Sequence, residues 1–220
     1  MWAKIIIKNT VDSEEISNRL LEWGFPLLWV EESENETVYV FDHVEKVENK
    51  IDWDAQSEQH SPYFSDGFIS IENLKLKPGA GFGDLSHPTT QLLVTLMTDL
   101  HGTVYDLGTG NGILACLAKS RGAEEVFAWD IDEEALKLAR ENALLNNLDI
   151  QFTPHLTPDI LLVNMIFSEQ KEALKGISAK RVIASGLREE DLDDYLKLFK
   201  GYTLEKKIDQ DGWIGIILMK

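Results

Sequence analysis

Short apolar segments alternate with helical segments along most of the chain, and this alternation restricts its fold more than any other feature. From about residue 68, apolar segments that each predict one strand, such as FISIENLKL, TVYDL, EEVFAW, DILLVN and KRVIAS, alternate with segments that have the periodicity of amphipathic helices. The apolar segments are nearly continuous, as expected for strands covered by helices on both faces of a sheet. The pattern predicts an α/β fold with a doubly wound, mostly parallel sheet.

The two ends of the chain have different patterns. The final segment, YTLEKKIDQDGWIGIILMK, predicts two strands joined at Asp211 and Gly212, which would add an antiparallel hairpin to the sheet. At the other end, WAKIIIK, DSEEISNRLLEWG, PLLWVEE and TVYVFD predict a small α+β region of strand, helix, strand and strand. A polar, irregular segment over residues 43–67 follows. We therefore expect a small region over residues 1–55 and a larger domain over residues 56–220.

Charge and composition exclude some classes of function. The chain carries 38 acidic and 21 basic residues, for a net charge of -17, so we expect no direct binding of nucleic acid. An acidic surface attracts basic partners, although in most proteins it serves only solubility. No apolar stretch reaches the length of a membrane span, and the N-terminus lacks the pattern of a signal peptide. With a single cysteine, Cys116, these features predict a cytoplasmic protein.

The strongest local signal is VYDLGTGNGILACLA, over residues 104–118. Gly108, Gly110 and Gly112 lie between an apolar strand and a helix, where glycine lets the backbone approach a ligand closely. The spacing G-x-G-x-G differs from the dinucleotide fingerprint, and no Walker lysine follows. Asp130 ends the next strand, where a carboxylate can accept hydrogen bonds from ribose hydroxyls. We interpret the loop as a nucleoside site rather than a plain strand-to-helix turn.

A second glycine-rich segment, PGAGFGDLSHPTT over residues 78–90, precedes an apolar helix. Pro88 suits the first turn of that helix, and His87 is interpreted as a structural cap. The turn-forming half is longer than a helix entrance needs, and from the residues alone it could belong to a site or only start the helix.

The segment DLGTGNGILA, with AWDIDEEALKLARENALLNN, resembles the class I S-adenosylmethionine-dependent methyltransferases. Four further segments are similar to the PrmA family, the ribosomal protein L-eleven methyltransferases: the linker IDWDAQSEQHSPYF, then LKPGAGFGDLSHPTT, LLVNMIF and VIASGL. The resemblance covers roughly residue 50 to the C-terminus. It implies a Rossmann-like, seven-stranded sheet, S-adenosyl-L-methionine as cofactor, and a small N-terminal region that recognises a basic ribosomal protein.

The same resemblance implies roles for individual residues. Asn164, Thr89 and Phe167 would form the catalytic group, with an Asn164 oxygen receiving the incoming amine. It implies no metal ligands, and the histidines show no metal-ligand spacing. The residues expected to bind the cofactor are Phe82, Thr90, Asp106, Gly108, Thr109, Gly110, Gly112, Asp130, Ile131 and Asn164.

Two departures from the family pattern keep alternatives open. The family's FGTG reads FGDL here, with Asp84 and Leu85, which predicts a changed loop. The interval before Asn164 is short, and neither Asp149, Thr153 nor His155 matches an adenine contact convincingly. Three hypotheses follow: a protein N-methyltransferase acting on lysine or N-terminal amines of a ribosomal protein, a methyltransferase of another protein or small amine, and a non-catalytic binding protein with a degenerate methyltransferase fold.

Overall fold

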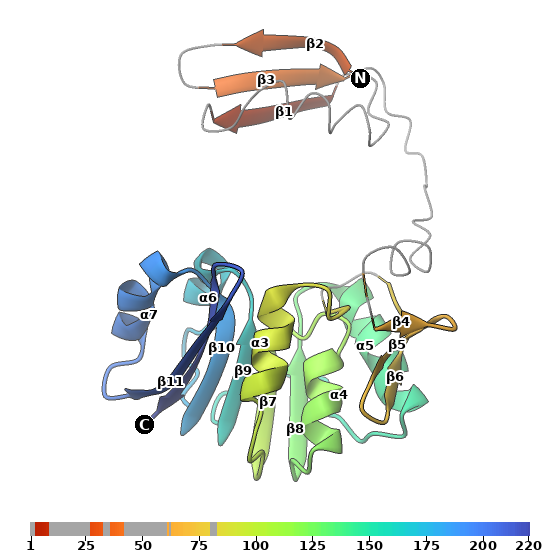
Figure 1. The fold of residues 1–220 in the computed structure, drawn as a ribbon, viewed down its shortest axis with the longest axis vertical. Helices are drawn as coiled ribbons and strands as arrows, with labels where there is room; N and C mark the ends of the chain where they lie inside the picture. The colour runs from red at the N-terminus through yellow and green to blue at the C-terminus, as the bar shows by residue number, and fades with distance from the viewer. Residues whose placement is uncertain (1–2, 9–26, 33–35, 42–60, 62, 80–82) are drawn as a thin grey trace. The chain divides into compact units, whose positions relative to one another are not determined.

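The computed structural model describes residues 3–8, 27–32, 36–41, 61, 63–79 and 83–220 (Figure 1). The chain divides into two compact units, Met1–Ile51 and Asp52–Lys220, which are described separately. The described helices include none long and apolar enough to cross a membrane.

The N-terminal unit contains a three-stranded antiparallel sheet of order β1-β3-β2. Its strands are β1 (Ala3–Lys8), β2 (Leu27–Glu32) and β3 (Glu36–Phe41). The three strands expected here are confirmed. The helix expected over residues 12–24 lies outside the described residues.

A six-stranded mixed sheet forms the centre of the second unit, in the order β11-β12-β10-β9-β7-β8. The strands β8, β7, β9 and β10 are parallel, β12 runs antiparallel to them, and β11 runs antiparallel to β12 and so in the same direction as the first four. This confirms the predicted α/β fold and its terminal hairpin, whose turn places Asp211 at φ 51° and Gly212 at φ 75°. The strands are β7 (Thr103–Leu107), β8 (Glu125–Trp129), β9 (Ile160–Asn164), β10 (Arg181–Leu187), β11 (Thr203–Gln210) and β12 (Trp213–Met219).

The described sheet has six strands where seven were expected, because the segment DIQFTP forms only an isolated bridge between Gln151 and Phe127. Gln151 donates to the Val126 carbonyl at 2.9 Å, and its own carbonyl accepts from the Ala128 amide at 2.9 Å. The Thr153 amide then bonds back to the same Gln151 carbonyl at 3.1 Å. The chain therefore turns away after one pair, leaving the seventh position of the sheet with a single bridge.

A second difference concerns FISIENLKL, which was expected to form one strand. It forms two strands, β5 (Phe68–Ile71) and β6 (Leu74–Leu76), which join β4 (Phe64–Ser65) in a small antiparallel sheet of order β4-β5-β6. Glu72 adopts φ 52° at the turn, a left-handed conformation that nothing in its residue type predicts.

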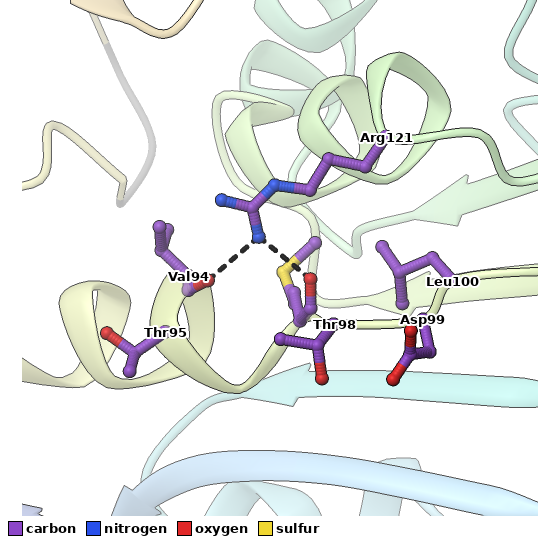
Figure 2. A pocket seen from close by; sticks show the side chains of 7 residues that line it. Val94, Thr95, Thr98, Asp99, Leu100 and Arg121 are labelled. Atoms are coloured by element: carbon purple, nitrogen blue, oxygen red, sulfur yellow. Dashed lines mark hydrogen bonds between the residues drawn. The ribbon is translucent and has the colours of Figure 1, made fainter.

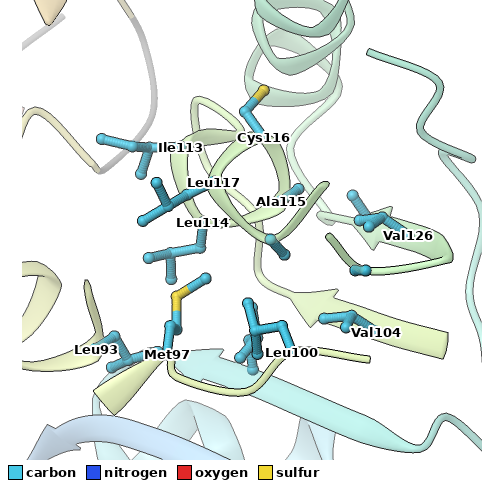
Figure 3. Packing of buried hydrophobic residues seen from close by; sticks show 14 of the residues in the cluster. Leu93, Met97, Leu100, Val104, Ile113, Leu114, Ala115, Cys116, Leu117 and Val126 are labelled. Carbon is cyan, nitrogen blue, oxygen red and sulfur yellow. The ribbon is translucent and has the colours of Figure 1, made fainter. Parts of the chain in front are cut away.

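Helices cover both faces of the large sheet. The side chains of each strand alternate between two buried clusters, so that Val104 of β7 enters the first cluster and Tyr105 enters the second. The first cluster includes side chains of α3 and α4, and the second includes side chains of α6 and α7 (Figures 1 and 3). The helices, with a short 3-10 turn, are α3 (Pro88–Leu96), α4 (Ile113–Ser120), α5 (Glu133–Leu145), α6 (Phe167–Ala173), η1 (Glu189–Asp191) and α7 (Leu192–Leu198).

The strand order also locates the site. After β7 the chain goes to β8 on one side, and it then returns to form β9 on the other side of β7. Such a switch point leaves a crevice beyond the carboxyl ends of the two central strands, where ligands bind in open α/β sheets. The loop after β7 contains the glycines, and Asn164 ends β9, so the topology brings these two segments together.

Candidate functional site

The loop after β7 has a backbone that only glycine adopts without strain. Gly108, Gly110 and Gly112 have φ values of 74°, 55° and 85°, all in the left-handed region. The amide of Gly108 donates to the Trp129 carbonyl at 2.8 Å, which fixes the loop against the end of β8. Gly112 is the N-cap of α4 and has no side chain to satisfy the first amides of that helix.

Two of these glycines also lie where a side chain would collide with a neighbour. A Cβ on Gly112 would lie 2.9 Å from the Ala139 Cβ of α5, and one on Gly108 would lie 2.6 Å from the Met165 Sδ. Glycine therefore lets α5 and the segment after β9 approach the loop closely.

Asp106 lies beneath the glycine loop and is completely buried. Its Oδ2 accepts hydrogen bonds from the Thr109 hydroxyl at 2.7 Å and the Ala115 amide at 3.1 Å, whereas its Oδ1 is buried without a described partner. Burial raises the pKa of this carboxyl from 3.8 to about 7, against the lowering effect of those two hydrogen bonds, and the negative charge of Asp130 adds to the rise. The site thus contains a buried carboxyl that titrates near neutral pH and has one unused oxygen.

Asp130, at the end of β8, braces the same loop. Its Oδ2 accepts from the Gly110 amide at 2.9 Å, and its Oδ1 accepts from the Asp132 amide at 3.0 Å. The next residue, Ile131, is 96% exposed, more than any other large apolar side chain reported for the described residues. An aliphatic side chain that stands in solvent beside a carboxylate is suited to be covered by a flat apolar group.

Asn164 ends β9 on the other side of the crevice. Its Nδ2 donates to the Thr90 hydroxyl at 3.2 Å, and its Oδ1 is buried without a described partner. The next carbonyl, that of Met165, accepts from the Gln170 Nε2 at 2.6 Å, and the same nitrogen donates to the Ser185 carbonyl at 2.8 Å. The side-chain oxygen of Asn164 is therefore available to a ligand, and the Met165 carbonyl is already bonded.

The α3 N-terminus borders this crevice. His87 is the N-cap, and its Nδ1 accepts from the Thr89 amide at 3.3 Å, which confirms the structural role expected for its ring. Burial lowers the pKa of His87, and the nearby positive charge of Arg188 lowers it further, whereas the Asp84 carboxylate raises it. Thr89 and Thr90 are both buried, and the Thr89 hydroxyl lies 2.9 Å from the His87 Nδ1.

The structure thus brings most of the expected residues together at the carboxyl ends of β7, β8 and β9. Thr109 is placed under the loop, where its hydroxyl is bonded to Asp106. Phe167 is half-buried, and its ring packs edge-on against Tyr195 of the second cluster, with the Lys171 Nζ 4.0 Å above it. Phe82 lies outside the described residues.

Gly83, Asp84 and Leu85, the described part of the segment FGDL, have defined hydrogen bonds despite the departure from the family pattern. Leu85 stands where the resemblance places a glycine and adopts φ 65°, yet its side chain is buried in the first cluster. The carbonyls of three consecutive residues each accept a side-chain hydrogen bond: Gly83 from the Asn111 Nδ2 (3.0 Å), Asp84 from the Ser61 hydroxyl (2.6 Å) and Leu85 from the Gln91 Nε2 (2.7 Å).

Sequence reasoning missed three buried amides that organise the site: Asn111, Asn142 and Gln170. Asn142 of α5 donates to the Asn111 carbonyl at 2.9 Å and accepts from the Lys77 amide at 2.8 Å, so it joins the two glycine-rich segments. For Asn142, the only signal in the sequence was an asparagine at an otherwise apolar position of a helix. Gln170 had no comparable signal.

A hollow of about 660 Å³ lies beside the N-terminal end of β7, at the opposite end of that strand from the glycine loop (Figure 2). The Arg121 Nη1 donates to the Val94 and Met97 carbonyls at 2.8 Å each, and its Nε and Nη2 donate to Glu72 at 3.1 and 2.6 Å. Because this guanidinium bonds the carbonyls at the C-terminal end of α3, we interpret the arginine that lines the hollow as a structural residue and not as part of a binding site.

Within the described residues no group of three His, Cys, Asp or Glu side chains could hold a metal, and Cys116 is buried in the first cluster.

Comparisons with known proteins agree with this geometry. The family model for "Ribosomal protein L11 methyltransferase (PrmA)" matches residues 65–220. The ribosomal protein L11 methyltransferase of Aquifex aeolicus is 34% identical over 194 residues, which cover 80% of this chain and 79% of that protein. That of Caldicellulosiruptor saccharolyticus is 39% identical over 168 residues, covering 67% of this chain and 54% of the relative.

Among solved structures, a ribosomal protein L11 methylase from Lactobacillus delbrueckii subsp. bulgaricus superposes with a TM-score of 0.60 and 28% identity. The match covers 71% of this chain and 90% of that one. Against several curated relatives the match spans only about half of the relative's length. The matched region includes every candidate site residue described above, and the chain belongs to the PrmA family of ribosomal protein L11 methyltransferases.

Proposed function

We propose that this chain is an S-adenosyl-L-methionine-dependent methyltransferase that methylates lysine or N-terminal amines of a ribosomal protein. The observation that carries the proposal is a pair of buried oxygens that have no hydrogen-bond partner among the described residues, Asp106 Oδ1 and Asn164 Oδ1, on the two strands that flank the switch point. Leaving such atoms without hydrogen bonds is costly, so a ligand is expected to supply the donors.

The residues around this pair fit the proposed cofactor. Asp106 Oδ1 would accept from the ammonium of its methionine part, over the glycine loop where no Cβ obstructs the approach. Asp130, which is half-exposed, would accept from the ribose hydroxyls, and Ile131 would be covered by the adenine ring. Thr109 would support Asp106 from below, and Phe82 and Thr90 would border the methyl group.

The bound cofactor supplies an electrophilic methyl group, and the protein has to place a neutral nitrogen in line with it. Asn164 Oδ1 would accept a hydrogen bond from the incoming amine and orient its lone pair. Thr90 fixes the amide of Asn164 by accepting from Nδ2, so that the oxygen and not the nitrogen faces the amine. A lysine amine has a pKa of about 10.4 and must lose a proton before it reacts. Thr89 and Phe167 would complete the walls of the site.

The partner and location follow from the same proposal. A net charge of -17 favours encounter with a basic protein, as ribosomal proteins are, and disfavours direct contact with nucleic acid. We assign recognition of that protein to the region over residues 1–55 and place the reaction in the cytoplasm. A different protein or a small amine is the alternative substrate.

Two measurements test the proposal. Calorimetry should detect S-adenosyl-L-methionine binding, which Asp106→Ala should abolish; no binding by the unaltered chain would identify a degenerate fold. Methyl transfer to purified ribosomal proteins should be lost in Asn164→Ala even when S-adenosyl-L-methionine is saturating. Glu205→Ala, at an exposed position on β11, is the matched control and should behave like the unaltered chain. Cofactor binding without transfer to any ribosomal protein would direct the search to another amine.

A further inference from the structure

We infer that Arg188 forms a carboxylate-binding subsite beside the amine position, so that the chain selects amines with an acidic group nearby. This inference rests on the proposed function and deepens it, because it specifies a chemical feature of the substrate. Arg188 follows β10 and has no part in the cofactor site described above.

The sheet places Arg188 on the same edge as Asn164. Ser185 of β10 pairs in parallel register with Asn164 of β9, and Arg188 lies three residues further in the strand direction. Gly186 has φ 83° and the pairing with β12 shifts register between Ala184 and Leu187, so three residues separate the two positions by at most about 10 Å along the strand. Arg188 and His87, which caps the helix that carries Thr90, both contact the Trp213 ring, so the guanidinium lies close to the α3 N-terminus.

The Arg188 guanidinium is held in one orientation. Its central carbon lies 3.7 Å from the centre of the Trp213 ring, and its Nη1 donates to the Gly212 carbonyl at 3.0 Å. The His87 ring meets the same indole edge-on, with 5.2 Å between ring centres. A guanidinium stacked on an aromatic ring loses little freedom when it binds a ligand, which favours planar recognition of a carboxylate.

The surrounding charges leave this cation available. None of the ion pairs among the described residues includes Arg188. The adjacent carboxylates are used elsewhere: Glu189 pairs with Lys207 at 2.6 Å, and Asp191 accepts from the backbone amide of Arg188 at 2.9 Å. The Asp84 carboxylate, which also acts on His87, accepts from Ser86. In a chain of net charge -17, a preorganised guanidinium with unused donors is suited to a carboxylate brought by the substrate.

The test uses two acetylated, amidated peptides that each contain one lysine and one glutamate. The glutamate lies three residues before the lysine in one peptide and three residues after it in the other, because three extended residues span about 10 Å. Matched peptides replace the glutamate by glutamine. Binding to the complex of the chain with S-adenosylhomocysteine is measured by calorimetry at fixed ionic strength, and methyl transfer is measured in parallel. The variants are Arg188→Gln, Arg188→Glu and, as a control, Arg140→Gln. The control alters an arginine on α5 whose guanidinium faces the Phe152 ring.

We expect the unaltered chain and Arg140→Gln to bind the glutamate peptide roughly three- to tenfold more tightly than its glutamine counterpart, in one of the two orders. Arg188→Gln should remove this preference. Arg188→Glu should instead bind most tightly a third matched peptide, in which arginine replaces the glutamate. A preference that is absent in the unaltered chain, or equal in Arg188→Gln, would overturn the inference, as would failure of every peptide to bind. Unimpaired peptide binding without methyl transfer would contradict the proposed activity instead, and leave the subsite standing.

Discussion

The unusual titration of Asp106 predicts that cofactor affinity depends on pH. Its pKa of about 7 in the free protein means that half of the molecules carry a neutral carboxyl at pH 7. The ammonium of the cofactor favours the ionised carboxylate, so binding should drive the proton off. Lowering the pH should therefore weaken binding.

The size of this effect follows from the pKa. Between pH 8 and pH 6 the protonated fraction of a group with a pKa of about 7 rises from about a tenth to about nine tenths. Affinity for S-adenosyl-L-methionine should consequently fall about tenfold, or about 1.4 kcal/mol, and about half a proton should be released at pH 7. Asp130→Asn removes a negative charge that raises the Asp106 pKa, so it should move the midpoint to lower pH.

The assay is calorimetry at pH 6, 7 and 8 in two buffers with different ionisation enthalpies, which counts the protons released. Asp106→Asn cannot ionise, so any pH dependence that it keeps belongs to the amino group of the ligand itself. Equal slopes for the unaltered chain and Asp106→Asn, with no extra proton released at pH 7, would refute the assignment of Asp106 as the partner of the ammonium.

The same pKa determines the sign of a stability effect in the free protein. The folded-state pKa is raised from 3.8 to about 7, so the folded state holds the proton more tightly than the unfolded state. The contribution of Asp106 to the free energy of unfolding should therefore be most favourable below about pH 4, and it should fall as the pH rises to about 7. The full effect is on the order of 4 kcal/mol, and the difference between the unfolding curves of the unaltered chain and Asp106→Asn isolates it.

Three further predictions concern single side chains. Gly112→Ala should lower the free energy of unfolding by about 1–3 kcal/mol more than Gly122→Ala in urea titrations, because both have positive φ but only Gly112 faces Ala139. Leu85→Gly should be about 1 kcal/mol more stable than Leu85→Ala, since both lose the buried side chain but glycine suits φ 65°. Thr90→Val should slow methyl transfer about tenfold in single-turnover assays, and Thr90→Ser should restore it.

The parts of the fold predictable from sequence are those decided by local chemistry. The three glycines between an apolar strand and a helix required left-handed backbone angles, and all three have them. Asp211 and Gly212 form the expected hairpin turn for the same reason. The alternation of apolar and helical segments was enough to predict a parallel sheet, and the strand order then placed Asn164 opposite the glycine loop.

The hairpin β5–β6 shows what local chemistry leaves undecided. FISIENLKL predicts one strand by its apolar residues, although Asn73 is a common turn residue and the apolar positions change phase between Ile71 and Leu74. Asn146 of α5 fixes the second strand: its Oδ1 accepts from the Lys75 amide at 3.0 Å and its Nδ2 donates to the Lys75 carbonyl at 2.7 Å. Those partners are 71 residues apart in the chain, so a short window of the sequence does not contain the contact that fixes the strand. The same holds for Asn142 at the site, whose partners Asn111 and Lys77 are 31 and 65 residues away.

The place of the Leu85 side chain bears on whether the chain is an active enzyme or a degenerate fold. A leucine in place of glycine would argue against activity if its side chain occupied the cofactor crevice or altered the loop. Instead the side chain is buried beside Leu93 and Leu96 in the first cluster, and the left-handed backbone is kept. Side-chain hydrogen bonds to three successive carbonyls hold the loop, and apolar burial of roughly 2 kcal/mol offsets the strain of about 1–2 kcal/mol at φ 65°. The substitution therefore uses space in the core, and the oxygens of Asp106 and Asn164 remain without described partners, which favours a working methyl-transfer site over a degenerate one.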